Sequence, residues 1–150
     1  MSNQSKSNWC LNSFNYDFRN SSLLELALTH RSYSAENNER LEFLGDAVLD
    51  LVLSDALFQL YPSVDEGSLS LMRASIVNER SLSALARQLG INDQIILGEG
   101  ESLSGGQQRD SILANTLEAI VGAIYLDSNF EKIADVIKTI FNDSINSIDP

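Results

Sequence analysis

Cysteine and histidine are scarce in this 150-residue chain, and each scarcity excludes a class of site. Cys10 is the only cysteine, so the chain forms no internal disulfide and no cysteine-built zinc site. His30 is the only histidine, which disfavours a di-iron carboxylate bundle, because that site requires paired Glu-x-x-His motifs. The low cysteine content fits a reducing compartment, and we expect a cytoplasmic protein.

Long apolar runs and basic residues are also in short supply. No apolar stretch reaches the length of a membrane-spanning helix, so the composition predicts a soluble globular protein with no membrane partner. Residues 1–8 are polar and lack the apolar segment of a secretory signal. The net charge is −11, from 21 acidic and 10 basic residues. This balance argues against nonspecific nucleic-acid binding by the domain alone, because phosphate neutralisation requires clustered lysine and arginine.

The apolar residues that are present recur at helical spacing, which predicts an all-α fold in one domain. Residues 1–15 are interpreted as a polar lead-in with at most a short helix over 9–14, and residues 16–150 as the folded domain. Further helices are expected at about residues 21–28, 38–60, 66–77, 79–89, 109–126 and 130–145, with a glycine-rich loop over 98–108. Pro62 ends the second of these helices, Asp65 caps the third and Gly90 supplies a left-handed residue after the fourth.

Acidic residues line one side of the long helix that begins near Asn38. Glu42 and Asp46 lie one turn apart, beside the stripe of aliphatic residues that the helix buries, and Glu39 lies about one turn earlier. Carboxylates held so close to a core repel one another unless a cation compensates, so a divalent metal site is one interpretation. A solvated acidic edge on an ordinary core helix is the other, and the helix alone leaves both open.

A second helix, over residues 109–126, repeats this combination of small and acidic residues. Asn115 and Glu118 share a side, and Gly122 lies one turn further on, as Gly45 lies beside Asp46 in the first helix. Glycine within a helix costs about 1 kcal/mol relative to alanine, so two such positions predict a close helix crossing. The crossing would gather four oxygen donors: Glu42, Asp46, Asn115 and Glu118. Oxygen donors select Mg²⁺ or Mn²⁺ over zinc and copper.

The segment from Asn38 to Leu49, NERLEFLGDAVL, resembles the signature of the nuclease domain of the ribonuclease III family, in its bacterial form. The likeness continues in the same order through residues 28–33, 73–79, 104–106, 109–114 and 125–127, and covers about residues 16–142. It implies an all-α homodimer that acts as an endoribonuclease on double-stranded RNA, in rRNA and mRNA processing. It also implies Mg²⁺-dependent hydrolysis, with Mn²⁺ as a substitute, leaving a 5′-phosphate and a 3′-hydroxyl.

The resemblance also implies roles for individual residues. Glu42, Asp46 and Glu118 match the metal-binding carboxylates of the family, together with the position held here by Asn115, and Asp46 and Glu118 match its catalytic residues. Glu39 and Glu79 match acidic residues near the scissile phosphates. Phe43 matches an aromatic that inserts into the partner subunit. Its position one step off the buried stripe, taken without the resemblance, favours a place in the monomer core.

Two departures from the family pattern affect these expectations. Asn115 stands where the family has aspartate, and an amide lacks the negative charge that attracts the metal. Three interpretations follow: a slower enzyme, a substitution introduced to trap bound RNA, or a natural RNA-binding relative that no longer cuts. The chain also ends at Pro150 without the double-stranded-RNA-binding domain that bacterial relatives usually carry.

The function therefore has three candidates before the structure is considered. The first is the Mg²⁺-dependent endoribonuclease, the second a non-cutting RNA-binding dimer, and the third an unrelated all-α interaction domain. His30 is interpreted as a hydrogen-bonded structural residue at a helix end. Five bases are candidates for phosphate contacts or, equally, for surface ion pairs: Arg31, Arg73, Arg80, Arg87 and Arg109.

Overall fold

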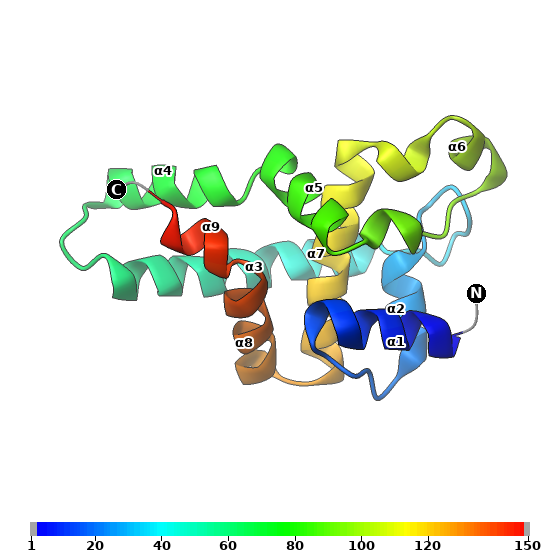
Figure 1. Cartoon of the computed structure of the whole chain (residues 1–150), viewed down its shortest axis with the longest axis horizontal. Coiled ribbons are helices and arrows are strands. Elements are labelled where there is room, and N and C mark those ends of the chain that lie inside the picture. The colour runs from blue at the N-terminus through cyan, green and yellow to red at the C-terminus, as the bar shows by residue number, and fades with distance from the viewer. Residues whose placement is uncertain (1–2, 149–150) are drawn as a thin grey trace.

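The computed structural model describes residues 3–148, and within that range it contains helices and turns but no strand. The helices are α1 (Asn3–Phe14), α2 (Ser21–Leu28), α3 (Glu39–Leu60), α4 (Glu66–Ile76), α5 (Glu79–Gln88), α6 (Glu99–Leu103), α7 (Asp110–Asp127), α8 (Phe130–Ile140) and α9 (Asn142–Asn146), with short 3₁₀ turns η1 (Ile91–Asp93) and η2 (Gly106–Gln108) (Figure 1). One isolated bridge joins Thr29 to Ile96. The all-α prediction is confirmed.

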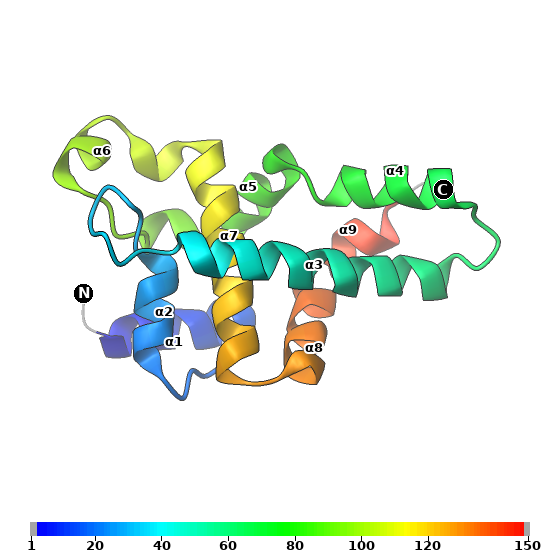
Figure 2. The ribbon, with the colours of Figure 1, turned by 180° about the vertical axis from the view of Figure 1, so that it is seen from behind.

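Helix α7 is the centre of the fold. Every residue from Ile112 to Ile124 except Asn115 is buried, so this helix is covered on nearly all sides. Helix α3 crosses α7 and continues beyond it, and α4 returns alongside α3 (Figure 1). The same crossing is visible from behind, where α2 and α1 lie on the other side of α3 from α4 (Figure 2). The apolar surface of α7 is thus buried against several amphipathic helices, which pack around it to form the hydrophobic core of the domain.

Two glycines permit the crossing of α3 and α7, as the sequence predicted. A Cβ placed on Gly45 would lie 1.7 Å from the backbone oxygen of Glu118, and one on Gly122 would lie 2.4 Å from the backbone oxygen of Leu41. Atoms do not approach this closely, so each helix has room for the backbone of the other only because a side chain is missing. The crossing point is therefore set by glycine.

Helix ends agree with the sequence at several positions. Asp65 accepts a hydrogen bond from the backbone N–H of Ser68 and caps α4, and Asn78 caps α5 in the same way through Ser81. Gly90 adopts a left-handed conformation with φ of 78°. Helix α2 is capped by Asn20, because the Asn20 side chain accepts from the backbone N–H of Ser22.

Two segments differ from the sequence-based expectation. Residues 3–14 form one helix that packs on the domain, with Cys10 and Phe14 in the core, so they are part of the folded unit rather than a lead-in to it. Polar residues hid this face, since the buried set also includes Lys6, which donates to the backbone oxygen of Gln94 at 2.9 Å. The expected helix over 130–145 is interrupted at Phe141, which is buried between α8 and α9.

Candidate functional site

Asp46 and Glu118 meet where α3 crosses α7. Glu118 is only 8% exposed, and its carboxyl hydrogen-bonds to that of Asp46. Burial raises the pKa of Glu118 to about 9, and the hydrogen bond and the negative charge of Asp46 act in the same direction. A hydrogen bond between two carboxyl groups requires a proton on one of them. Glu118 therefore carries a proton at neutral pH and donates it to Asp46 when no cation is bound.

Further carboxylates on α3 extend this pair in both directions. Burial raises the pKa of Glu42, and repulsion from Glu39 and Asp46 raises it further, against an opposing effect of Arg31. Burial also raises the pKa of Asp50, one turn beyond Asp46, with repulsion from Asp46 as the next cause. The negative charges of Glu42 and Asp50 both act on Glu118 as well. The acids of α3 and α7 thus form one electrostatically coupled group.

Asn115 lies on α7 one turn before Glu118 and faces a cleft of about 320 Å³. Glu39 and Glu42 line the same cleft from α3. The remaining lining residues are His30, Arg31, Asn38, Glu101, Arg109, Ser111, Ile112 and Thr116. The structure therefore brings the predicted donors from both helices to one region, with Asn115 and Glu42 in the cleft and the Asp46–Glu118 pair at the crossing.

The donor set agrees in chemistry with a hard divalent cation. All four predicted ligands offer oxygen, and the proton held between Asp46 and Glu118 marks a place where a positive charge is favoured. Within residues 3–148, however, no three histidine, cysteine, aspartate or glutamate side chains are arranged to hold one ion together.

The two acids assigned to the scissile phosphates have different positions. Glu39 lines the cleft, and its Oε2 lies 3.9 Å from Nη1 of Arg31. Glu79 is exposed in the first turn of α5 and does not line the cleft. A single chain therefore brings Glu39, but not Glu79, to the acidic cluster.

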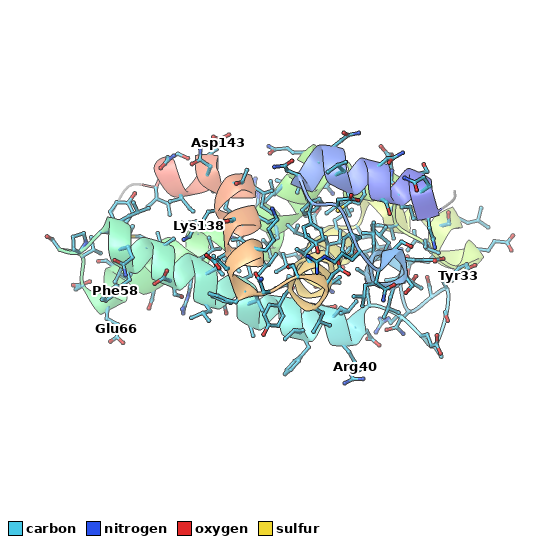
Figure 3. The ribbon with its side chains drawn as sticks, turned by 90° about the horizontal axis from the view of Figure 1, so that it is seen from below. Tyr33, Arg40, Phe58, Glu66, Lys138 and Asp143 are labelled. Carbon is cyan, nitrogen blue, oxygen red and sulfur yellow. The ribbon has the colours of Figure 1, made fainter. Side chains whose placement is uncertain are left out.

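Phe43 is 81% exposed, so the interpretation that it completes the monomer core is wrong. It borders an apolar hollow on the outside of α3, together with Leu23, Leu26, Leu41, Leu44 and Leu126. Exposed apolar residues continue along α3, with Leu51 two turns on and Phe58 near the helix end, where Figure 3 labels it. The contact with a partner subunit stays a prediction.

His30 follows α2 and is hydrogen-bonded, as the sequence-based interpretation expected. Its Nδ1 accepts from the backbone N–H of Ser32 at 3.1 Å and lies 2.8 Å from Ser32 Oγ. Burial lowers the pKa of His30, so the imidazole is neutral near pH 7. The Oγ of Ser32 in turn accepts from the backbone N–H of Gly98, which joins this loop to the glycine-rich segment.

Sequence reasoning missed two acids near the site. The four-residue step from Asp46 could have identified Asp50. Glu101 lies in α6, which is remote from α3 in the sequence, and no spacing rule connects the two.

Within the described residues no helix has the length and apolar character needed to cross a membrane.

Comparisons with known proteins point to one family. A family model described as Ribonuclease-III-like matches residues 20–144. The chain is 52% identical over 135 residues to "Ribonuclease 3" of Idiomarina loihiensis, a match that covers 90% of the chain and 59% of that protein. It is also 52% identical to "Ribonuclease 3" of Nitrosomonas eutropha, with 90% and 55% covered. The chain thus spans somewhat more than half the length of these two curated relatives.

Solved structures extend the likeness to the fold. The nuclease domain of ribonuclease III from Campylobacter jejuni superposes with a TM-score of 0.89 at 42% identity, covering 95% of this chain and 97% of that one. A second structure of the same domain, with 92% and 97% covered, is described as showing flexibility in a region involved in dimer formation. Dicer from Pichia stipitis, at 22% identity and a TM-score of 0.67, shares the fold.

Proposed function

Because the chain belongs to the ribonuclease III family and forms its nuclease domain, we propose that it is an endoribonuclease that cuts double-stranded RNA with a bound Mg²⁺ ion. We include Mn²⁺ as a substitute, products with a 5′-phosphate and a 3′-hydroxyl, and a role in processing rRNA and mRNA. The cytoplasm is the proposed location. The observation that carries the proposal is the buried carboxyl of Glu118 against Asp46, beside a cleft that also contains Glu42 and Asn115.

The residues of the chain have distinct tasks in this mechanism. Glu42, Asp46 and Glu118 would hold the cation through carboxylate oxygens, and Asn115 through its amide oxygen. The bound ion supplies an acidified water molecule and neutralises charge on the phosphate. Glu118 would have to lose its proton to ligate the cation, so the burial that raises its pKa would make ligation depend on pH. Glu39 and Glu79 are proposed to lie near the scissile phosphates.

The reaction needs no nucleophile from the protein. The single cysteine is buried in α1, and burial raises the pKa of its thiol to about 12. The single histidine uses its Nδ1 within its own loop. Water is therefore the proposed attacking group, in line with the leaving 3′ oxygen, and the task of the protein is to position the phosphate and the carboxylates.

Two chains are proposed to form the working unit. Phe43 of each chain would occupy the apolar hollow on the outer side of α3 of its partner, because an aromatic that is 81% exposed has most of its surface to bury. The described flexibility of a dimer-forming region in the Campylobacter jejuni domain is consistent with this assembly. Two clefts in one dimer would each cut one strand of the duplex.

A second candidate function rests on one observation, the amide of Asn115 inside the cleft. An amide removes one negative charge from the proposed ligand set and offers a donor where a carboxylate offers only acceptors. The chain would then bind double-stranded RNA as a dimer while cutting it slowly or not at all. In either case the proposed nuclease domain, residues 16–150, has α1 packed against it as part of the same folded unit.

Incubation of the protein with a long RNA duplex distinguishes the two functions. We expect cleavage in Mg²⁺ at high protein concentration, none in EDTA, and none from Asp46→Ala or Glu118→Ala in either condition. Binding of the duplex without cleavage in any divalent cation would support the second function. An absence of both binding and cleavage would contradict both candidates.

A further inference from the structure

If the chain is the proposed nuclease, on which the following argument rests, its few basic side chains must contact the phosphates of the RNA despite the net charge of −11. Of the five candidate arginines, the structure places Arg31 and Arg109 in the cleft, with Glu42 and Asn115. Arg87 donates to the backbone oxygen of Gln108 at 2.9 Å and to Asp110 at 2.6 Å, outside the cleft lining. Arg73 donates to Ser54 at 2.8 Å and borders a different hollow.

Glu101 fixes one of these two cleft arginines. Nε of Arg109 lies 3.2 Å from Oε2 of Glu101, and Nη2 of Arg109 donates to the backbone oxygen of Ser104 at a marginal 3.5 Å. Arg31 is less restrained, because its side chain is 71% exposed and its contact with Glu39 measures 3.9 Å. Arg109 is also the residue at the N-cap of α7, which anchors its backbone to the helix that carries Asn115.

The loop is shaped to hold Glu101 in this position. A Cβ on Gly106 would lie 2.6 Å from Cγ and 2.8 Å from Oε2 of Glu101, so the carboxylate rests in space that only glycine leaves open. Oε2 is buried and accepts no hydrogen bond from the described residues, which makes the ionic contact with Arg109 its compensating interaction. A buried carboxylate oxygen without a hydrogen bond is costly, so its position next to an arginine calls for a functional reason.

Arg109 retains donors for a ligand after these contacts. A guanidinium has five N–H groups. Glu101 and Ser104 occupy at most two of them, and the side chain remains 53% exposed. An arginine held in one orientation loses less conformational entropy when it binds a phosphate, and its planar fork suits two phosphate oxygens.

We propose that Glu101 is a positioning residue, which holds Arg109 at the rim of the cleft so that the free N–H groups of Arg109 bind a phosphate of the RNA strand to be cut. The cleft joins the loop that carries α6 to the loop that leads into α3, and the two loops lie side by side in the ribbon (Figures 1 and 2). The acid adds negative charge near the RNA, yet its net effect on binding is favourable.

Substitution of Glu101 tests the proposal because simple electrostatics predicts the opposite result. Removing a negative charge from a protein of net charge −11 should tighten RNA binding slightly. Glu99→Gln provides the matched control, since Glu99 lies in the same helix, is exposed and does not line the cleft. Binding of an RNA duplex is measured by fluorescence anisotropy in EDTA, where no cleavage occurs, and KM and kcat are measured separately in Mg²⁺.

We expect Glu101→Gln and Arg109→Gln each to weaken duplex binding about tenfold, which is the effect of losing one charged hydrogen-bonded contact. The double variant should bind no more weakly than Arg109→Gln, because both changes remove the same contact. The slope of log affinity against log salt should fall by about one unit per chain in both single variants. KM should rise about tenfold, kcat should change little, and Glu99→Gln should bind at least as tightly as the unchanged chain.

A second pair of variants displaces Glu101 without changing the charge. The methyl group of Gly106→Ala would overlap the side chain of Glu101 and also its backbone oxygen, at 2.9 Å, so the carboxylate and the turn that carries it must both move relative to Arg109. A Cβ on Gly100 of the same loop would meet nothing within 4 Å. We expect weakened binding from Gly106→Ala and unchanged binding from Gly100→Ala, with circular dichroism confirming that both are folded. If Gly106→Ala does not fold, Glu101→Gln still decides the matter.

The outcomes separate this inference from the function on which it rests. Tighter or equal binding by Glu101→Gln relative to Glu99→Gln, with the unchanged chain binding and cutting RNA, would overturn the positioning role alone. The positioning role is also overturned if the loss of affinity in the double variant equals the product of the losses in Glu101→Gln and Arg109→Gln. The two residues would then act independently. Failure of the unchanged chain to bind any duplex would overturn both the nuclease function and this inference.

Discussion

Gly45 lies so close to Glu118 that a Cβ added to Gly45 would be 1.7 Å from the backbone carbonyl oxygen of Glu118. This single relationship joins the fold to the site, because the contact that lets α3 cross α7 also sets Asp46, the next residue, beside the side chain of Glu118. A change that separates the helices must therefore affect stability and the acidic pair together.

Gly45→Ala should destabilise the protein by about 3 kcal/mol or more and abolish RNA cleavage, since the methyl group would overlap a backbone that has no freedom to move. The free energy of unfolding is measured by urea denaturation. Gly67→Ala is the matched control, because Gly67 also lies within a helix, α4, and its added Cβ would meet nothing closer than 3.9 Å. That control should change the stability by less than about 1 kcal/mol, in the stabilising direction. Equal effects of the two substitutions would refute the close-crossing argument.

The crossing was predictable from the sequence because each of two long helices has an interior glycine near an acid, adjacent to Asp46 in α3 and one turn after Glu118 in α7, which is a local and unusual feature. The surroundings of the site were less predictable. The partnership of Glu101 with Arg109 depends on the conformation of a glycine-rich loop, which periodicity does not specify. Helix α1 was underestimated because its buried face includes Lys6 and Ser7, whose polarity conceals the helical pattern. The exposure of Phe43 also needed the structure, because one step along a helix separates a core position from a surface one.

Stability in EDTA should fall as the pH rises through the range set by Glu118. Its pKa is raised from 4.5 to about 9 in the folded protein, so between these values the folded state retains a proton that the unfolded state has lost. Unfolding then takes place with proton release, and stability decreases with pH by at most about 1.4 kcal/mol per unit. Glu118→Gln keeps a hydrogen-bond donor to Asp46 without a titrating proton, and it should lose most of this dependence. The free energy of unfolding of both proteins is measured by urea denaturation from pH 5 to 9. Parallel curves of this free energy against pH would contradict a protonated Glu118 beside Asp46.

Asn115→Asp should strengthen Mg²⁺ binding and raise the rate of RNA cleavage, each by at least about tenfold, because it restores a carboxylate to the cleft. The same change should lower the melting temperature in EDTA, since the added charge repels the acids Glu39 and Glu42 of the same cleft when no cation is present. Isothermal titration calorimetry and thermal unfolding with and without Mg²⁺ provide the measurements. Asn12→Asp is the charge-matched control, because Asn12 is exposed on α1, and it should leave Mg²⁺ affinity unchanged. A melting temperature of Asn115→Asp that does not respond to Mg²⁺ would argue against position 115 as a ligand.

Phe43→Ala should weaken self-association while the helical content remains the same. The side chain is 81% exposed in one chain and borders an apolar hollow, so we expect it to act as an aromatic anchor at the interface. Truncating such an anchor costs about 2 kcal/mol or more of association free energy, which is roughly a 30-fold rise in the dissociation constant. Sedimentation equilibrium gives the constant, and circular dichroism gives the helical content. Leu103→Ala is the control, because Leu103 is 82% exposed on α6 and does not line that hollow. If both variants associate as the unchanged chain does, the hollow beside Phe43 is not the dimer contact. If only Phe43→Ala dissociates, and RNA cleavage declines with it, then two chains together form the working nuclease.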